Sequence, residues 1–305
     1  MLKGVANIDA DSTAVQSRLA GALMVLGSGA IFSFTPWLFR GADESVGPWQ
    51  FLAWRAVSAA AAMTVWLAAR HGSAAVAVVR SARSPEVVAG LVLAGAFTLF
   101  ILALDRVSTA MVLLLQALAP FVAALFGWVA LRERVERPTA IAMVVALTGV
   151  MVMVGFGFGD QDGIGIALSL LLAVNVGLIS VAMRRSADAD PAVVPLIGTL
   201  AAAVMAVVMS TVTGGLFFGA VDMLRAIVAG GVLLGVGLPL YTGSHKSVPA
   251  AIVPLLLLSE IILAPVWVWV FIDEVPATST IIGGVIVLAA VIGLTLASRN
   301  KPASV

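Results

Sequence analysis

Apolar residues run along the chain in long stretches, which short charged or Pro- and Gly-containing segments separate. A bilayer core about 30 Å thick needs about 20 apolar residues per spanning helix, so each stretch can cross it. The pattern predicts ten helices, over residues 19–39, 49–70, 86–104, 108–131, 138–156, 163–183, 191–213, 224–244, 247–271 and 277–297. Their connections are mostly a few residues long. The pattern therefore predicts an all-α integral membrane protein with no extramembrane domain.

Composition supports this interpretation and narrows the classes of function. Of the 305 residues 61% are apolar and 11% charged, and the formal net charge is +1. Soluble proteins carry about a quarter charged residues, and a polyanion-binding surface needs a larger positive charge. The expected partners are therefore the lipid bilayer and a small molecule, with no nucleic acid. The chain has no Cys and only two His, so we expect no metal site, no cofactor and no enzymatic nucleophile.

The distribution of Lys and Arg predicts the orientation, because cytoplasmic loops retain positive charge. If the N-terminus is inside, the outer loops hold only Arg40, Arg106 and Arg225, and Arg55 lies within the second helix. All other cations then fall on the inner side. An even number of helices places both termini in the cytoplasm, and we expect a multi-pass protein of a bacterial-type inner (plasma) membrane.

The two halves of the chain resemble each other at an offset near 140 residues. Residues 88–95 (VAGLVLAG) read almost the same as residues 228–235 (VAGGVLLG). Further matches in the same order pair Gly21 with Gly165, Arg40 with Arg184, Pro48 with Pro191, and Glu133 with Glu274. Each half has five spans, an odd number, so the second half starts on the opposite side of the membrane. The sequence thus predicts two inverted five-helix repeats, 19–156 and 163–297, as found in many alternating-access transporters.

A family resemblance rests on the end of each half. The first half has Ala119-Pro120-Phe121-Val122, then Leu131-Arg132-Glu133-Arg134 and Gly149; the second has Ser259-Glu260, Asp273-Glu274, Gly283 and Gly293. These stretches resemble the end of an EamA repeat in the drug/metabolite transporter superfamily. Arg132 replaces the usual Gly and Ile261 the expected Pro. The resemblance implies ten helices, a central cavity formed mainly by the first four spans of each half, and export or uptake of small metabolites, often amino acids.

Two charged residues inside predicted spans are the main candidates for a binding site, since a charge in lipid costs a few kcal/mol or more. Glu260 lies about thirteen residues into the ninth span, near the bilayer midplane. Its carboxyl group suits proton coupling or a substrate ammonium, and the alternative is a static ion pair or helix brace. Arg55 either binds a substrate carboxylate, pairs with Glu260, or extends to the outer headgroups. Together the two charges match those of an amino-acid zwitterion.

Other residues are weaker candidates. Trp54 and Phe34 are candidates for stacking on a substrate, and Gln116 and Asn175 for polar contacts in a cavity, with interhelical hydrogen bonds as the alternative. Most aromatic residues near the span ends, among them Tyr241 and Trp267, are expected in an interfacial belt. Pro36, Pro120, Pro239 and Pro265 interrupt apolar stretches and are candidate hinges, or else static kinks.

The sequence therefore favours a secondary active transporter that moves small metabolites, with export of amino acids as the first hypothesis. The alternative is an organic-cation, drug or other metabolite transporter of the same fold, with Glu260 as the cation or proton site. Because both halves lie in one polypeptide, a monomer is expected to suffice.

Overall fold

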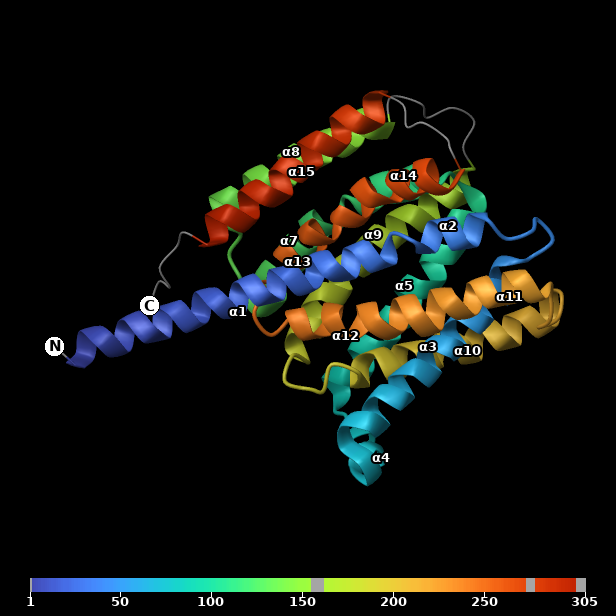
Figure 1. The fold of residues 1–305 in the computed structure, drawn as a ribbon, viewed down its shortest axis with the longest axis horizontal. Coiled ribbons are helices and arrows are strands. Elements are labelled where there is room, and N and C mark those ends of the chain that lie inside the picture. Colours follow the sequence, from blue (N-terminus) through green and yellow to red (C-terminus); the bar gives the residue numbers. More distant parts are fainter. Residues whose placement is uncertain (1, 155–161, 273–277, 300–305) are drawn as a thin grey trace.

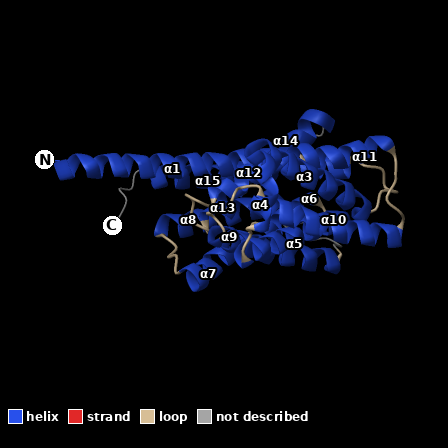
Figure 2. Cartoon of the chain, turned by 90° about the horizontal axis from the view of Figure 1, so that it is seen from below, coloured by secondary structure: helices blue, strands red, loops and turns tan. Residues whose placement is uncertain are grey.

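The computed structural model describes residues 2–154, 162–272 and 278–299, and this part of the chain is helical with no β-strand (Figure 1). Figure 2 shows the helices packed side by side in one elongated bundle. The helices are α1 (Leu2–Phe32), α2 (Thr35–Arg40), α3 (Pro48–His71), η1 (Gly72–Ala74), α4 (Ala75–Arg80), α5 (Ser84–Arg106), α6 (Thr109–Gln116), α7 (Ala119–Leu131), α8 (Arg137–Val154), α9 (Gly163–Arg185), α10 (Val193–Thr213), α11 (Ala220–Ile227), η2 (Val228–Leu234), α12 (Gly235–Ser244), α13 (Ile252–Leu257), α14 (Ser259–Ile272) and α15 (Thr278–Arg299). The all-helical prediction is confirmed.

Seven helical segments of the described chain are long and apolar enough to cross a membrane, judged by length and composition. They are Gln16–Arg40, Pro48–Arg80, Ser84–Arg106, Met111–Leu131, Gly163–Arg185, Val193–Thr213 and Ala220–Ser244. Three shorter apolar helices, Arg137–Val152, Ile252–Ala264 and Ile281–Gly293, complete the series in the order of the predicted stretches. The chain is therefore a multi-pass membrane protein, while the count of ten spans stays a prediction.

Three of the predicted spans are interrupted. The breaks lie at 33–34, between α1 and α2, at 117–118, between α6 and α7, and at Leu258, between α13 and α14. Pro36 and Pro120 lie in the first turn after the first two breaks, where the missing N–H of proline leaves no helical hydrogen bond unmade. No proline lies in the first turn of α14. The third break therefore has no proline at the position that marks the other two.

The packing of the helices pairs segments from the two halves of the chain. Helix α3 packs along α10, and α8 along α15. Further contacts come in couples: α5 on α9 and α12 on α1, then α5 on α10 and η2 on α3. Helix α7 also packs on α9. Figure 1 shows α8 and α15 side by side at one edge of the bundle. A Cβ on Gly149 of α8 would lie 2.9 Å from the carbonyl oxygen of Gly283, so this pair approaches backbone to backbone.

Glycines lie at the contact of α5 with α9 and at the matching contact of α12 with α1. A Cβ added to Gly165 would lie 2.5 Å from Val107 at the end of α5. A Cβ added to Gly21 would lie 2.7 Å from Val248, after α12. Arg40 donates to the carbonyl oxygen of Val107, and Arg184 donates to that of Lys246 at 2.9 Å. The matches between Gly21 and Gly165, and between Arg40 and Arg184, thus correspond to similar contacts in space.

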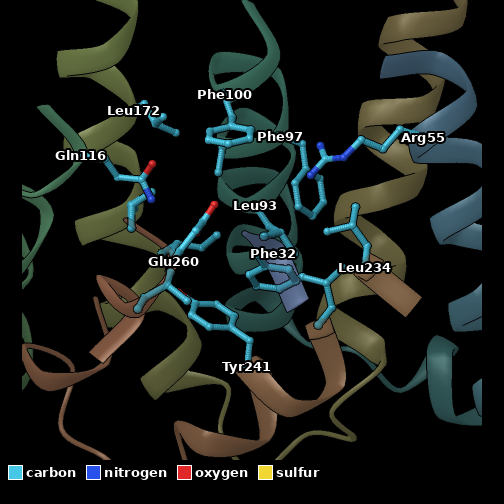
Figure 3. Close-up of a pocket in the computed structure, with 15 residues that line it drawn as sticks. Phe32, Arg55, Leu93, Phe97, Phe100, Gln116, Leu172, Leu234, Tyr241 and Glu260 are labelled. Atoms are coloured by element: carbon cyan, nitrogen blue, oxygen red, sulfur yellow. The ribbon is translucent and has the colours of Figure 1, made fainter. Parts of the chain in front are cut away.

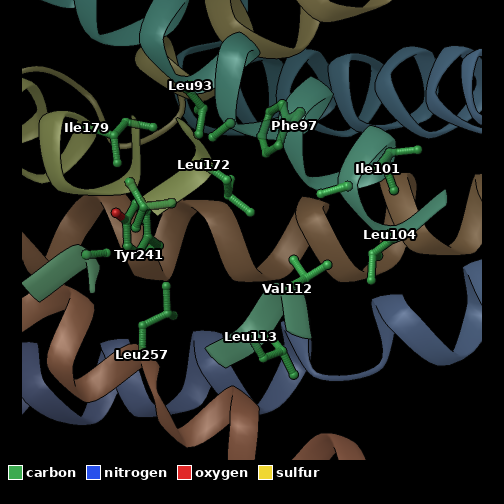
Figure 4. Packing of buried hydrophobic residues seen from close by; sticks show 14 of the residues in the cluster. Leu93, Phe97, Ile101, Leu104, Val112, Leu113, Leu172, Ile179, Tyr241 and Leu257 are labelled. Carbon is green, nitrogen blue, oxygen red and sulfur yellow. The ribbon is translucent and has the colours of Figure 1, made fainter. Parts of the chain in front are cut away.

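The apolar interior is formed where these helices meet (Figure 4). Figure 4 labels Leu93, Phe97, Ile101 and Leu104 of α5, Val112 and Leu113 of α6, Leu172 and Ile179 of α9, Tyr241 of α12 and Leu257 of α13. All ten side chains are buried. Six of them also line the cavity of the candidate site: Leu93, Phe97, Leu172, Ile179, Tyr241 and Leu257.

Candidate functional site

A cavity of about 90 Å³ lies among helices of both halves. This volume has room for several water molecules, since one needs roughly 10–15 Å³ by the same measure. Its lining is Phe32, Arg55, Leu93, Ala96, Phe97, Phe100, Gln116, Leu172, Val176, Ile179, Leu234, Leu238, Tyr241, Leu257 and Glu260. Apart from Arg55, Gln116, the hydroxyl of Tyr241 and Glu260, these side chains are apolar. The cavity therefore combines a few polar groups with a largely apolar and aromatic wall.

Glu260 enters this cavity from the second position of α14, directly after the break at Leu258. Glu260 is buried, with 5% of its surface exposed. The N-terminus of a helix carries a partial positive charge, which offsets part of the cost of a buried carboxylate. Gly29 of α1 lets the backbone come close, since a Cβ there would lie 3.6 Å from the Glu260 nitrogen and 2.4 Å from Ser259 Oγ.

Arg55 reaches the cavity from α3 and is 4% exposed. Its Nε and Nη1 atoms have no hydrogen-bond partner among the described residues. The guanidinium carbon lies 5.3 Å from the centre of the Phe97 ring, a cation–π contact. The Nε and Nη1 atoms are therefore unused donors that a bound anion could accept from.

Glu260 and Arg55 point toward one another from different sides of the cavity (Figure 3). Within the described chain no ion pair of 4.0 Å or less joins them. The direct pair considered from the sequence is therefore not formed. The arrangement leaves a carboxyl group on one side, cationic donors on the other, and Phe97 and Phe100 between them.

Of the two amides predicted for the site, only one lines the cavity. Gln116, the last residue of α6, lies on the same side as Glu260 (Figure 3), and its Oε1 has no partner among the described residues. Asn175 packs instead against α5, where a Cβ on Gly95 would lie 2.8 Å from its Nδ2. Its buried Oδ1 also has no partner in the described chain.

The two aromatic residues predicted for stacking lie outside the cavity lining. Trp54 Nε1 donates to the carbonyl oxygen of Leu216 at 2.9 Å, which ties α3 to the segment after α10. Phe34 stacks on Trp267 with ring centres 4.1 Å apart, and Trp267 Nε1 donates to Ser33 Oγ at 2.7 Å. Trp54 and Phe34 therefore make contacts between segments outside the cavity lining.

The predicted hinge prolines fall at different kinds of position. Pro36 and Pro120 follow helix breaks, as described above. Pro239 lies inside α12, between the lining residues Leu238 and Tyr241. Pro265 lies within α14, and its side chain is outside the described part of the structure. Whether any of these positions bends during function stays a prediction.

Four aromatic lining residues were not singled out as site residues from the sequence: Phe32, Phe97, Phe100 and Tyr241. The expectation for Tyr241, an interfacial belt, is wrong, because it is 4% exposed and its ring packs against Phe32 at 6.5 Å. Helix α12 turns this face toward α1 and the cavity. In a helix that is apolar all round, no polar face indicates which side is internal, so the sequence carries no signal for these four positions.

The comparisons with known proteins agree with this architecture. Residues 19–155 match the model of the EamA-like transporter family. This half of the chain belongs to the EamA-like transporter family. The EamA resemblance found in the sequence is thereby confirmed, and it indicates a membrane transporter of small molecules.

One solved structure, described only as the crystal structure of a protein, matches this chain with a TM-score of 0.79. The identity is 20%, and the match covers 93% of this chain and 100% of the other. At this identity the match shows a shared fold and nothing about function. No curated protein matches this sequence.

Proposed function

We propose that this EamA-type protein is a secondary active transporter that exports amino acids by alternating access around the central cavity. The observation that carries this proposal is the pair of buried, opposite charges that face the same space without joining. Arg55 offers unused donors for a carboxylate, and Glu260 with Gln116 offers acceptors for an ammonium group. The remaining lining is apolar, which favours amino acids with large apolar side chains.

The proposed architecture is two inverted five-helix repeats, 19–156 and 163–297, in ten spans. The coupled contacts support it: exchanging the halves converts the contact of α5 with α9 into that of α12 with α1, and the contact of α5 with α10 into that of η2 with α3. In inverted-repeat carriers, exchanging the conformations of the halves opens the site to the other side of the membrane. Because each half contributes to one cavity, a monomer is sufficient.

For localisation we propose a bacterial-type inner (plasma) membrane with both termini in the cytoplasm. The chain contains no cysteine, so single cysteines can be introduced without background. A thiol introduced at Arg18 should react with an impermeant reagent only from the inside, and one introduced at Asp43 only from the outside. Labelling of both positions from the same side would contradict the proposed orientation of the first span.

The central experiment uses the full-length protein in liposomes and three forms of one ligand: a large neutral amino acid, its decarboxylated amine and its deaminated acid. Wild type should take up the amino acid in preference to both analogues. Arg55→Gln should remove the preference over the amine, and Glu260→Gln the preference over the acid. Each loss should be about 10- to 100-fold, the value of a hydrogen bond to a charged group.

The same preparation tests proton coupling at Glu260. If this carboxyl group carries the proton, a pH gradient should drive uptake in wild type and have no effect on Glu260→Gln. Normal folding of the variant is checked by size-exclusion profile and thermal stability. Transport by Glu260→Gln at the wild-type rate with unchanged pH dependence would remove Glu260 from the mechanism.

A second candidate is transport of organic cations, favoured by the aromatic rings that surround Glu260. Phe32, Phe97, Phe100 and Tyr241 line the same cavity, and aromatic rings bind quaternary ammonium groups. Here Glu260 meets the cation and Arg55 is structural. Competition of labelled amino-acid uptake by choline-like cations decides between the two: strong competition by the cation, undiminished in Arg55→Gln, would favour this alternative.

A further inference from the structure

The segment that touches Arg55 from the second half is an unusual one. η2, Val228–Leu234, is a π-helix between α11 and α12. It packs on α3, and its Leu234 lines the cavity on the side of Arg55 (Figure 3). π-turns are rare and are found often at functional sites. η2 therefore packs beside a buried cation whose Nε and Nη1 have no hydrogen-bond partner in the described chain.

Gly230 is the point of contact. A Cβ added to Gly230 would lie 1.9 Å from the carbonyl oxygen of Arg55 and 2.2 Å from Ser58 Oγ. Real side chains do not approach this closely, so only glycine fits unless α3 moves. At the neighbouring Gly231 the nearest atom would be Ser58 Cβ at 3.6 Å, an ordinary contact.

The π-turn also accommodates one extra residue. Gly90 of α5 and Gly230 occupy matching positions, and each packs on a helix of the other half. The next matching contacts are those of Val107 with Gly165 and of Val248 with Gly21. The chain from Gly230 to Val248 is one residue longer than that from Gly90 to Val107. A π-turn takes up one residue more than an α-turn. The turn at residues 245–247, after α12, also lies within this stretch.

Few contacts in the described chain fix the position of the Arg55 guanidinium. Its Nε and Nη1 make no hydrogen bond in the described chain, and its one ring contact is with Phe97. Its location therefore depends on the backbone of α3. Trp54 fixes that backbone on one side through Leu216, and Gly230 limits it on the other.

We infer that Gly230, presented by the π-turn of η2, is the positioning residue for Arg55 and thereby determines selectivity for substrates that carry a carboxylate. Gly230 itself contacts no substrate. The inference rests on the proposed function in one respect, the role of Arg55 as the carboxylate site.

The first experiment compares Gly230→Ala with the matched control Gly231→Ala in the liposome assay. Gly230→Ala should reduce uptake of the large neutral amino acid about 10-fold or more, within the range for a lost bond to a charged group. Uptake of the decarboxylated amine should stay unchanged, which a merely structural defect would not allow. Gly231→Ala should behave as wild type. Equal preference for the amino acid over the amine in Gly230→Ala and wild type would overturn the inference.

A second measurement is independent of the substrate. With Arg55→Cys as the background, the rate of modification by a methanethiosulfonate reagent reports the placement of position 55. Adding Gly230→Ala should change this rate severalfold, and adding Gly231→Ala should not. If wild type shows no preference for the amino acid while the rate changes, the carboxylate role fails but the positioning stands. An unchanged rate overturns the positioning itself.

Should Gly230→Ala fail to give folded protein, deletion of Gly231 provides the same test. Removing one residue lets the π-turn close to an α-turn, which withdraws Gly230 from Arg55. The deletion should reproduce the selective loss of amino-acid uptake and the altered thiol rate. Wild-type values for both would contradict the inference.

Discussion

Residues 88–95 and 228–235 have almost the same sequence and form different helices. The first segment, VAGLVLAG, is regular α-helix within α5, whereas the second, VAGGVLLG, forms η2 and the first residue of α12. Both use their shared glycine against a helix of the other half. Gly90 meets Ile197 and Gly198 at the start of α10, and Gly230 meets Arg55 and Ser58 of α3.

From this difference we infer that two factors decide whether the segment is an α-helix or a π-helix. One is the helix that packs against it, and the other is the number of residues up to the next matching contact. Against α10 the glycine faces the side chain of Ile197 and the backbone of Gly198, and the segment is a regular α-helix. Against α3 it faces a serine and a carbonyl oxygen, and one more residue must be accommodated before the next matching contact. Each prediction below tests one part of this contrast.

The largest effect is expected from deleting one residue in each segment. Deletion of Leu91 from α5 turns the rest of that helix by about 100°, so the buried Phe97 and Ile101 lose their places, each worth about 2–5 kcal/mol. Deletion of Gly231 removes the extra residue of the π-turn and leaves the following helix in place. We expect no folded protein from the first deletion and a melting temperature within about 5 °C of wild type from the second.

Yield, size-exclusion profile and thermal unfolding in detergent measure this difference. The wild-type chain is the reference for both. Equal loss of folded protein from the two deletions would show that η2 does not act as a one-residue insertion.

An intermediate effect is expected from Gly90→Ala, the counterpart of Gly230→Ala. A Cβ at Gly90 would lie 2.6 Å from Ile197 and 3.2 Å from the Gly198 nitrogen. Such overpacking costs about 1–3 kcal/mol, and it should appear as a lower free energy of unfolding. The preference for amino acid over amine should not change, because neither of the charged cavity residues, Arg55 and Glu260, lies at this contact. A shift in that preference would mean that the two glycines have the same role.

The smallest effect concerns the first helix of each half. Helix α9 starts after Asp162, whose carboxylate accepts hydrogen bonds from the Ile164 N–H at 3.0 Å and from Arg106 Nη1 at 3.2 Å. Helix α1 instead begins at Leu2, well before the predicted span starts at residue 19. The bond from the Ile164 N–H, and then that from Arg106, lowers the pKa of Asp162 below its usual value. A lowered pKa adds stability above about pH 4, and this stability is lost as the pH falls through the lowered pKa.

Asp162→Asn should therefore reduce the change in melting temperature between pH 6 and pH 3 by a small amount. The asparagine can still accept the Ile164 N–H, so stability at pH 7 should fall only slightly. Glu44→Gln, which removes an exposed carboxyl group from the loop between α2 and α3, is the control. An unchanged acid dependence in Asp162→Asn would show that this cap does not contribute.

Much of the fold could be predicted because the bilayer imposes it. A stretch of about 20 apolar residues has one stable form in lipid, a helix with its backbone hydrogen bonds satisfied internally. The same cost singled out Glu260 and Arg55, since a charge in lipid needs a cavity or a partner, and both lie in the cavity. The proline-marked breaks before Pro36 and Pro120 follow from the missing N–H in the same way.

The break at Leu258, the π-turn of η2 and the inward face of Tyr241 were not predictable. Each depends on which helix lies opposite: α1 beside the start of α14, α3 beside Gly230, and Phe32 beside Tyr241. An apolar helix can turn any face to a neighbour or to lipid at similar cost, since there is no water to select one. The sequence by itself determined which segments are helices and that Glu260 and Arg55 are buried. Close packing between helices decided which faces meet around the cavity, because only there do single side chains and carbonyl oxygens exclude the alternatives.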